Sequence, residues 1–568
     1  MELPLMKSKS SIAYFSMEIG LDSDMPTYAG GLGVLAGDTI RSAADMGIPF
    51  VAISLLPRKG YFYQSIDATG WQTEQPVVWP VEDYLIDTGI VIELEIEQRL
   101  IKVRSWLFEV EGSKGNRVPV YFLDTNLPEN SEFDRTLTHF LYGGDIFFRL
   151  CQEVILGVGG VKMLRALGYA NLKRFHMNEG HASLLVIELL NELMAQPHAE
   201  ERSIDDLYAH IHSKCVFTTH TPVPAGHDKF PVDMANRVLG NKVPFCNLNE
   251  DFYYKNELNM TYLALKYSRF VNGVAKKHQE ISQHMFSDYK IDSITNGIHI
   301  GTWIAKPMEK ILNRAIPDWC NDNSSLRYIL GVDLESIKQA HRSSKNKLLR
   351  DINQHTNAGL NMKHFTIGFA RRMTPYKRAD LIFSDLDRLK KIAKQFPLQI
   401  IYAGKAHPHD HNGKDIIQHI YRLKEELKDS IKIVFLSGYD MNLARELVSG
   451  CDIWLNTPQP PMEASGTSGM KAAINGVPSL SVLDGWWIEG CIENVTGWSF
   501  DSSEEHKSTQ ENDANSLYDK LEKTILPLFY NTNDEYVKVM RNAIAINGSF
   551  FNTERMLNQY ISKAYFGE

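Results

Sequence analysis

Short runs of β-branched and other apolar residues alternate along the chain with stretches of helical periodicity. Many of these runs are apolar throughout, and each precedes a loop and a helical stretch. Such runs are typical of strands that are covered on both faces, and therefore of parallel α/β sheets. The first series of runs comprises Ile12–Met17, Ile48–Ser54, Val118–Leu123, Leu172–His176, Lys214–Thr218 and Ile291–Thr295. The second comprises Phe365–Ala370, Leu398–Ala403, Ile431–Leu436, Asp452–Leu455 and Ser479–Leu483.

The two series predict two doubly wound domains, 1–300 and 301–568, with a boundary near residues 297–330. Doubly wound domains bind ligands outside the carboxyl ends of their strands, so we expect the site in a cleft between the two. The polar stretch Asp501–Asn515 predicts a surface loop. Apolar residues at helical spacing near the C-terminus predict a helix that packs back on the N-terminal domain. They are Met556, Leu557, Tyr560, Ile561, Ala564 and Tyr565.

Composition narrows the class of protein. The chain has 568 residues, of which 43% are hydrophobic, enough for a sizeable core. Its formal net charge of −9 argues against a general nucleic-acid binder. The 6 cysteines are scattered and form no CxxC pair, so neither a disulfide framework nor a structural zinc site is indicated. Without a membrane-length apolar run or a signal-like start, we expect a soluble, cytoplasmic protein that binds neither membranes nor nucleic acid.

A glycine-rich segment, Tyr28–Gly37, follows a predicted strand and opens a helix that we expect to run through Met46. Glycines let a ligand approach the backbone closely, and a helix start offers N–H groups to an anion. The spacing of Gly31, Gly33 and Ala36 also resembles a dinucleotide-binding fingerprint, but the preceding loop is too long for a tight Rossmann turn. A tight turn with close helix packing would explain the same glycines.

Two further segments combine charge with a predicted helix start. Arg371–Arg378 carries four cations around Thr374, a predicted N-cap, and Pro375, a predicted first helical residue. The helix dipole disfavours cations there, so a bound phosphate would suit them; a solvated charged turn is the alternative. Glu463–Lys471 places small and hydroxyl residues at a helix entrance that also suits phosphate. Lys471 could link covalently to an aldehyde cofactor or could simply be exposed.

Polar residues follow three predicted strands, where they could bind a polar ligand or merely form turns. They are Asn178-Glu179-Gly180-His181, Thr219-His220-Thr221 and Thr295-Asn296-Gly297. His407, His409 and His411 alternate in a predicted loop but lack a clear companion ligand, so we expect no metal site. Trp486-Trp487 could line a sugar groove or serve as a buried anchor.

With these segments in this order, the chain resembles the α-glucan phosphorylase family, which includes glycogen and maltodextrin phosphorylases. The resemblance extends from Ile12 through the C-terminal helix, and its most specific segment is Glu463–Lys471. Arg372-x-x-x-Tyr376-Lys377-Arg378 and Tyr28–Gly37 support it. It implies an α/β GT-B fold, in which two Rossmann-like doubly wound domains face a central cleft. It also implies reversible phosphorolysis of terminal α-1,4-linked glucosyl units of glycogen, starch or maltodextrin, giving α-glucose 1-phosphate with retention of configuration.

The resemblance further implies a cofactor, pyridoxal 5′-phosphate, whose phosphate group takes part in the chemistry. The implied partners are an α-glucan and inorganic phosphate, and the chain is a possible homodimer. The implied catalytic residues, which would bind the substrate phosphate, are Arg372, Lys377 and Gly31. The implied cofactor-binding residues are Lys471, Arg371, Thr467, Tyr439 and Trp303. The implied substrate-binding residues are Gly30, His220 through its backbone, Asn296, Tyr376, Glu463, Ser465 and Gly466.

The chain also departs from the long enzymes of that family. Asp440 follows Tyr439 where they have Arg, and Ser468-Gly469 replaces their Gly-Asn. Both features are typical of a shorter prokaryotic branch, although the additional N-terminal domain often seen in that branch is not evident. Two alternatives stay open: a nucleotide-sugar glucan synthase, which shares the GT-B fold but needs no cofactor lysine, and a non-catalytic glucan-binding or regulatory protein.

Overall fold

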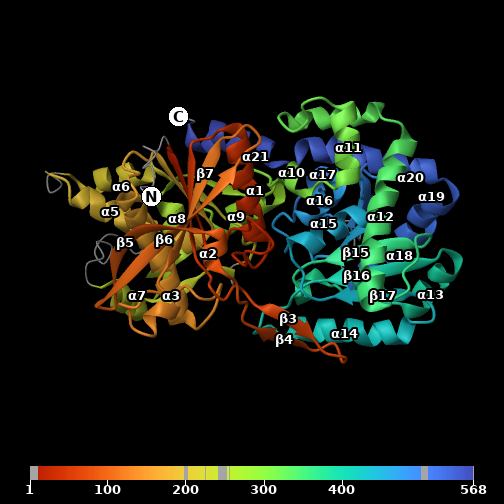
Figure 1. Cartoon of the computed structure of the whole chain (residues 1–568), viewed down its shortest axis with the longest axis horizontal. Coiled ribbons are helices and arrows are strands. Elements are labelled where there is room, and N and C mark those ends of the chain that lie inside the picture. The colour runs from red at the N-terminus through yellow and green to blue at the C-terminus, as the bar shows by residue number, and fades with distance from the viewer. Residues whose placement is uncertain are drawn as a thin grey trace. The chain divides into compact units, whose positions relative to one another are not determined.

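The computed structural model describes residues 10–197, 202–223, 226–240, 253–254, 256–500 and 509–566. The chain forms two compact units (Figure 1). Unit 1 comprises Met1–Phe62, Pro76–Thr295 and Met556–Glu568, and unit 2 comprises Tyr63–Gln75 and Asn296–Arg555. Unit 2 therefore includes a short segment, Tyr63–Gln75, that lies in the sequence among the elements of unit 1.

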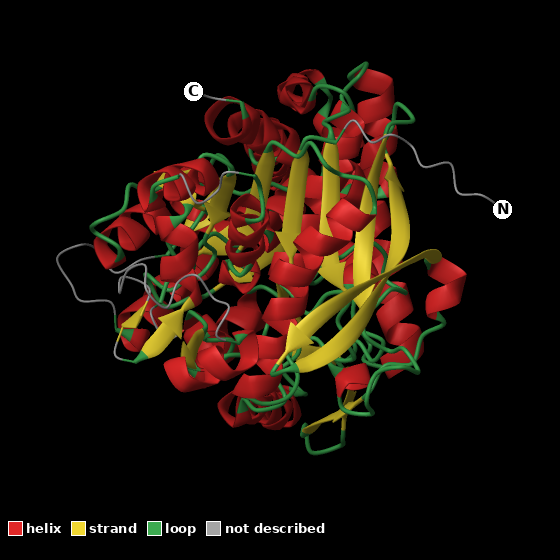
Figure 2. Cartoon of the chain, turned by 90° about the vertical axis from the view of Figure 1, so that its left-hand side faces the viewer, coloured by secondary structure: helices red, strands yellow, loops and turns green. Residues whose placement is uncertain are grey.

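Unit 1 is built on a nine-stranded sheet with the order β14-β13-β9-β8-β1-β2-β7-β6-β5 (Figure 2). Every strand that the first series of apolar runs predicts is present, although some ends differ. These strands are β1 (Ile12–Ser16), β2 (Phe50–Leu55), β7 (Arg117–Asp124), β8 (Arg174–Asn178), β9 (Cys215–Thr218) and β14 (Asp292–Ser293). β1 pairs in parallel with β2 on one side and with β8 on the other. The pattern did not predict β13 (Ser268–Gly273), which lies between β9 and β14.

Both faces of this sheet are covered, as the apolar runs require. Ala13 and Phe15 belong to one hydrophobic cluster, whereas Ile12 and Tyr14 belong to another. Because successive side chains of a strand point to opposite faces, the two clusters are the cores on either side of the sheet. The helices of unit 1 are α1 (Gly31–Met46), α2 (Val81–Tyr84), α3 (Ile146–Val154), α4 (Gly160–Ala166), α5 (Leu185–Met194), α6 (Ile204–His212), α7 (Val232–Leu239), α8 (Met260–Lys266) and α9 (Lys276–Met285). A further helix, α21 (Thr553–Tyr560), begins in unit 2 and belongs to unit 1 from Met556 on.

One edge of the sheet is antiparallel, which corrects the expectation of purely parallel sheets. β5 (Ile86–Ile96) pairs antiparallel with β6 (Arg99–Glu111), and β6 pairs antiparallel with β7. The two outer strands alternate buried with exposed positions and carry charged residues on the open side. A strand that is covered on one face leaves no continuous apolar run, so the pattern used above did not detect it. A small separate sheet contains β10 (Lys229–Pro231), β11 (Tyr253–Tyr254) and β12 (Glu257–Asn259).

The helix predicted to open at the glycine-rich segment and to run through Met46 is confirmed as α1. It ends at Gly47, whose φ of 66° is left-handed and suits glycine. The C-terminal segment continues from α21 into a π-helical turn, Ile561–Tyr565. Its apolar residues, Met556, Leu557, Tyr560, Ala564 and Tyr565, lie in the same buried cluster as those of α1.

Unit 2 is built on a six-stranded parallel sheet with the order β17-β16-β15-β18-β19-β20. Its strands are β15 (Phe365–Ala370), β16 (Leu398–Ala403), β17 (Lys432–Leu436), β18 (Ile453–Asn456), β19 (Ser479–Ser481) and β20 (Gly497–Ser499). The first two coincide with their predicted bounds. A two-stranded hairpin, β3 (Tyr63–Ile66) and β4 (Gln72–Gln75), also belongs to this unit.

The helices of unit 2 are α10 (Ile300–Trp303), α11 (Lys306–Ala315), α12 (Leu334–Thr356), α13 (Leu386–Gln395), α14 (His411–Leu427), α15 (Met441–Gly450), α16 (Ser468–Ile474), α17 (Trp487–Gly490), α18 (Gln510–Lys520), α19 (Leu526–Asn531) and α20 (Asn533–Asn542). The loop predicted for Asp501–Asn515 is wrong from residue 510 on, where α18 begins with Thr509 as its N-cap. Residues 501–508 lie outside the described part of the chain. Trp486 and Trp487 are only 4% and 1% exposed, so they form a buried anchor and not an open groove.

A buried charge network ties α12 to the sheet of unit 2. Asp452, which is 1% exposed, accepts hydrogen bonds from Lys345 Nζ at 2.5 Å and His341 Nε2 at 2.9 Å. The backbone N–H of Thr366 in β15 also donates to it, at 2.7 Å. Burial alone would raise the pKa of Asp452, but Lys345 and His341 outweigh it and hold the pKa below its ordinary value. Asp452 is therefore ionised and neutralises Lys345.

We expect Asp452→Asn to lower the free energy of unfolding of unit 2 by about 3–5 kcal/mol, because it leaves the Lys345 ammonium buried without a counter-charge. Urea unfolding at neutral pH measures the loss. The matched control is Asp415→Asn on an exposed position of α14, which should change stability by less than about 0.5 kcal/mol. Equal stability of the two variants would contradict this role for Asp452.

Candidate active site

Three charged side chains meet beyond the carboxyl ends of the strands of unit 2. Arg371 follows β15, and its Nη2 donates to Glu463 Oε2 at 2.7 Å. Lys377 Nζ donates to the same oxygen at 2.5 Å. The side chains of both cations are 8% exposed, and that of Glu463 is 10% exposed. The structure thus brings together three residues that the sequence assigned to different roles.

The helix start predicted within Arg371–Arg378 is confirmed in position, with Thr374 at the N-cap and Pro375 as first residue, but it opens only a 3₁₀ turn. Pro375–Lys377 forms a single 3₁₀ turn, and Arg378 ends it with a left-handed φ of 46°. Thr374 makes no side-chain capping bond. So short a turn has little dipole, and the cations are compensated by Glu463 instead of by a helix-bound anion. Arg378 has a structural partner, because its Nη1 donates to Asp513 Oδ2 at 2.6 Å.

Glu463 is the carboxylate that pairs with both Arg371 and Lys377. Burial alone would raise the pKa of Glu463, but Arg371 and Lys377 outweigh it and lower the pKa to about 2. One carboxylate therefore faces two cations. Among the described residues, Arg371 Nη1, Thr374 Oγ1 and Ser465 Oγ are buried without a hydrogen-bond partner. Buried polar atoms normally have partners, so this group has the capacity to bind a further anionic or hydroxyl-rich molecule.

Asp484 fixes the backbone at Glu463. Its Oδ2 accepts the Glu463 N–H at 2.8 Å, and its Oδ1 accepts the Gly485 N–H at 2.9 Å. Burial raises the pKa of Asp484 to about 6. Gly466 has a left-handed φ of 76°, and a Cβ there would lie 3.2 Å from Glu463 Oε1. A glycine at 466 therefore lets the chain turn sharply past this carboxylate.

Lys471 lies in α16 with 8% of its surface exposed, so the exposed alternative is excluded. Its Nζ is 3.8 Å from the centre of the Trp303 ring, at the end of α10. Asn475 joins the two residues, because its Nδ2 donates to the carbonyls of Trp303 and Lys471, both at 2.9 Å. Its Oδ1 accepts the Ala305 N–H at 2.8 Å. The sequence analysis did not single out Asn475.

The two departures from the long enzymes have local explanations. Asp440 caps α15 by accepting the Leu443 N–H at 2.8 Å. Ser468 Oγ accepts the indole N–H of Trp454 at 3.0 Å. A Cβ at Gly469 would lie 2.8 Å from the ring of Trp486, so a larger residue does not fit there.

The other predicted residues of unit 2 lie at these same loops. Tyr376 offers its ring to Lys377, whose Nζ is 4.4 Å from the ring centre. Thr467 immediately precedes α16, Tyr439 precedes the α15 cap and is partly buried, and Arg372 is exposed. Asn296 is 5% exposed, and its carbonyl accepts a bond from Arg555 at 3.0 Å.

In unit 1, a buried carboxylate that the sequence analysis missed holds the glycine-rich segment. Glu18 Oε2 accepts the N–H of Ala29 at 2.5 Å and that of Gly30 at 3.0 Å, and Oε1 accepts the hydroxyl of Tyr142 at 2.7 Å. A Cβ at Gly33 would lie 2.7 Å from Glu18, so close packing explains that glycine. At Gly31 a Cβ would meet nothing within 4 Å, so this position is open to a ligand.

A second carboxylate of unit 1, Glu179, lies beyond β8 with an unusual φ of 77°. It accepts the N–H of His220 at 2.7 Å and the hydroxyl of Thr221 at 3.0 Å. His220 Nε2 also donates to Asn178 Oδ1 at 2.7 Å. Burial raises the pKa of Glu179 to about 7 and lowers that of His220 to about 3. The imidazole is therefore neutral, and Glu179 is close to half ionised at neutral pH.

Comparison with known proteins now adds to this geometry. Residues 247–555 match the carbohydrate phosphorylase family. The chain belongs to this family. The maltodextrin phosphorylase of Thermococcus litoralis is 37% identical to it over 98% of this chain and 71% of the relative. The glycogen phosphorylases of Mycobacterium tuberculosis and Aquifex aeolicus are each 34% identical over 98% of this chain, and the matches cover 71% and 86% of those relatives. The resemblance found in the sequence is thus confirmed.

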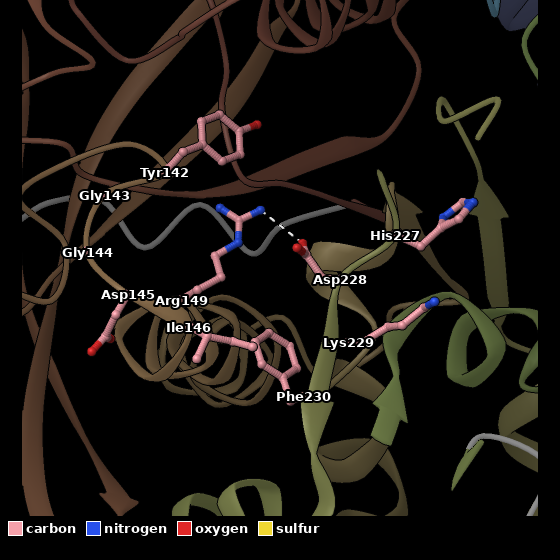
Figure 3. A pocket seen from close by; sticks show the side chains of 10 residues that line it. All are labelled: Tyr142, Gly143, Gly144, Asp145, Ile146, Arg149, His227, Asp228, Lys229 and Phe230. Carbon is pink, nitrogen blue, oxygen red and sulfur yellow. Dashed lines mark hydrogen bonds and ion pairs between the residues drawn. The ribbon is translucent and has the colours of Figure 1, made fainter. Parts of the chain in front are cut away.

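Unit 1 of this phosphorylase-family chain contains a cavity of about 460 Å³ between the segment 142–149 and the segment 227–230 (Figure 3). Arg149 extends into it from α3, donates to Asp228 at 3.0 Å and lies 4.6 Å from the ring centre of Tyr142. Burial raises the pKa of neighbouring Glu153 well above its ordinary value. The sequence analysis missed Arg149, Asp228 and Glu153; Arg149 and Asp228 are separated by 79 positions, whereas Arg149 and Glu153 lie one helical turn apart.

The described residues contain no group of three or more histidine, cysteine, aspartate or glutamate side chains placed to hold a metal ion. None of the helices they form is long and apolar enough to cross a membrane.

The pKa of Glu179 predicts a pH-dependent stability. Because its folded-state pKa of about 7 exceeds the ordinary 4.5, the folded protein holds the proton more tightly than the unfolded chain does. This contribution is fully present below pH 4.5 and is lost as the pH rises through 7, which amounts to at most about 3 kcal/mol. We expect Glu179→Gln to remove this slope.

Urea unfolding at pH 5 and pH 8 measures this pH dependence of stability. The difference in stability between wild type and Glu179→Gln should change between these pH values, whereas Glu129→Gln, at an exposed position, should follow the wild type at both. A pH-independent difference would show that Glu179 does not titrate in this range.

Proposed function

We propose that this chain catalyses the reversible phosphorolysis of terminal α-1,4-linked glucosyl units of an α-glucan. The substrates are glycogen, starch or maltodextrin together with inorganic phosphate, and the product is α-glucose 1-phosphate with retained configuration. The observation that carries the proposal is the group of Arg371 and Lys377 around Glu463, with its unpartnered buried donors. Such a group suits a phosphate and a sugar together. The names of the relatives, maltodextrin and glycogen phosphorylases, support the same reaction.

The residues around Lys471 suit pyridoxal 5′-phosphate. A sheltered amine can bind an aldehyde covalently, and that of Lys471 lies over the face of Trp303. Arg371 Nη1 and Thr374 Oγ1 are buried donors without partners, which suits an anionic phosphate group. In this proposal Lys471 holds the cofactor, Trp303 packs beside it, and Arg371, Thr467 and Tyr439 bind its phosphate. When bound, the cofactor supplies a phosphate group that assists proton transfer to and from the substrate phosphate.

The chain's own cations stabilise the charge that develops in the reaction. Arg372 and Lys377 bind the substrate phosphate, and the N–H of Gly31 adds a neutral donor. A fixed set of donors around a developing anion is a large source of catalysis in a site that excludes water. Because the N–H groups of Gly30 and His220 already donate to Glu18 and Glu179, these two residues contact substrate through other atoms.

The sugar is held by polar groups of the same loops. The carboxylate of Glu463 accepts hydrogen bonds from glucosyl hydroxyls, and Ser465 Oγ, buried without a partner, donates or accepts one more. Asn296, Tyr376 and Gly466 complete this set. A GT-B cleft between the two units stays a prediction from the sequence. A homodimer and a cytoplasmic location remain predictions from the sequence.

We expect Lys377→Ala to lower kcat/KM for phosphorolysis by about 10²–10³-fold, since it removes a buried charge-assisted donor. Release of glucose 1-phosphate from maltodextrin, with and without inorganic phosphate, measures the reaction on protein loaded with pyridoxal phosphate. The control is Lys432→Ala on an exposed position of β17. Equal turnover in the two variants would exclude Lys377 from the site. A reaction that requires UDP- or ADP-glucose instead of phosphate would contradict the proposed function.

We expect Lys471 to be the covalent attachment point of the cofactor. Borohydride reduction should fix pyridoxal phosphate to the peptide that contains Lys471, and mass spectrometry should locate it there. Lys471→Ala should lose both this adduct and nearly all phosphorolysis, because no other group in the loop presents an amine. The exposed Lys428→Ala should retain both. An adduct on another lysine would overturn the assignment.

A further inference from the structure

The hairpin β3–β4 belongs to unit 2, although the residues on either side of it in the sequence belong to unit 1. Figure 1 shows it beside α14. Two contacts hold it to that helix. Glu74 pairs with Lys414 at 2.8 Å, and a Cβ at Gly70 would lie 2.6 Å from the side chain of Tyr421.

Gln64 and Gln72 are 2% and 0% exposed. Gln64 Nε2 donates to Gln72 Oε1 and to the carbonyl of Gly404, both at 2.9 Å, and Gln64 Oε1 accepts the N–H of Gly438 at 2.9 Å. Gln72 Nε2 donates to the carbonyl of Ala406, and Gln72 Oε1 accepts the N–H of Ala406, again at 2.9 Å. The two amides thus hold the backbone at three points of unit 2.

Both amides are saturated. Gln72 Nε2 also donates to Glu74 Oε1 at 2.6 Å, so each amide uses two donor bonds and at least one acceptor bond. Burying an amide is costly unless it is fully hydrogen-bonded, and apolar residues of similar size could cover the same loops without that cost. The amides differ from apolar residues because their hydrogen bonds are directional and fix one conformation of the loop backbone.

The loops that they hold support the proposed cofactor-phosphate residues. Arg371 N–H donates to the carbonyl of Ala403 at 3.2 Å, and Met373 N–H to that of Lys405 at 3.0 Å. A Cβ at Gly404 would lie only 1.9 Å from the carbonyl of Arg371. The backbone at Arg371 is therefore held by hydrogen bonds to, and close packing against, the segment from Ala403 to Lys405.

The second loop leads to Tyr439. Gly438, whose N–H donates to Gln64, has a left-handed φ of 70° and directly precedes Tyr439. Asp440 then caps α15. Tyr439 is therefore fixed on one side by the hairpin and on the other by the helix cap.

We propose that Gln64 and Gln72 are positioning residues for the cofactor phosphate. They fix the conformation of the loops that orient Arg371 and Tyr439. The hairpin, which is flanked in the sequence by segments of unit 1, therefore completes the phosphate-binding side of unit 2. The inference rests on the proposed function, because it concerns the cofactor that the function requires.

The test compares two isosteric changes on one strand. Gln72→Glu replaces the donor that faces the Ala406 carbonyl with a negatively charged oxygen, beside Glu74. Gln75→Glu makes the same change at an exposed position of β4. We expect Gln72→Glu to release pyridoxal phosphate about 10- to 100-fold faster. This is the range by which binding weakens when residues that support the ligands of a metal ion are altered. Gln75→Glu should match the wild type.

Three readouts separate positioning from general stability. They are the dissociation rate of the cofactor followed by its absorbance, the thermal unfolding of the cofactor-free protein, and kcat and KM for phosphate at saturating cofactor. Positioning predicts faster release and a higher KM for phosphate in addition to any lower unfolding temperature, which the buried charge of Gln72→Glu itself causes. Gln64→Leu, which adds no charge, should show the same pattern more weakly, and it carries the test if Gln72→Glu does not fold.

The outcomes also separate this inference from the proposed function. Wild type that carries out phosphorolysis, together with variants that release the cofactor at the wild-type rate, overturns the inference alone. A loss of unfolding temperature with unchanged cofactor release shows a purely structural hairpin and overturns it too. Wild type that binds no pyridoxal phosphate and needs no inorganic phosphate defeats the proposed function, and with it the inference.

Discussion

The ion pairs of Glu463 with Arg371 and Lys377 are the interaction on which the candidate site of unit 2 depends. Two buried cations at the end of a sheet are tolerated only with a counter-charge, and Glu463 Oε2 supplies it to both. Glu463 thus shares its charge between two cations, and the nearby carboxylate of Asp484 interacts with both Glu463 and Lys377. These ion pairs couple the segment that follows β15 to the segment that leads into α16.

Buried carboxylates also organise loops elsewhere in the chain. Glu18 and Glu179 in unit 1, like Asp484 in unit 2, each accept two backbone N–H groups of a loop. A buried loop must satisfy its backbone polar groups, and a carboxylate can accept several N–H donors at once. Loops held in this way lose little conformational freedom when a ligand binds. Burial also disfavours the charged form of these carboxylates, and it raises the pKa to about 7 at Glu179 and about 6 at Asp484.

The departures from the long enzymes follow from packing in the same region. Asp440 is a helix cap, Ser468 bonds to Trp454, and Gly469 leaves room for Trp486. Each of these three residues has a structural explanation, so they do not argue against an active site. They show that this chain supports its loops in its own way, and the buried amides of Gln64 and Gln72 are part of that support.

The sequence by itself determined the central strands of unit 2, the full length of α1 and the segments that contain the candidate site residues. β15 and β16 lie at their predicted bounds because burial on both faces demands an unbroken apolar run. The pattern missed the β5–β6 edge because burial on one face leaves apolar and polar residues in alternation. Pro375–Lys377 forms a single 3₁₀ turn, and the side chain of Lys377 pairs with Glu463, a carboxylate that is distant in the sequence. Only the tertiary structure decided the partners, since Arg371 and Glu463 are separated by 92 positions and Gln64 and Gly404 by 340. A local pattern shows which side chains stand at a strand end, but which groups satisfy them depends on how the whole chain brings its loops together.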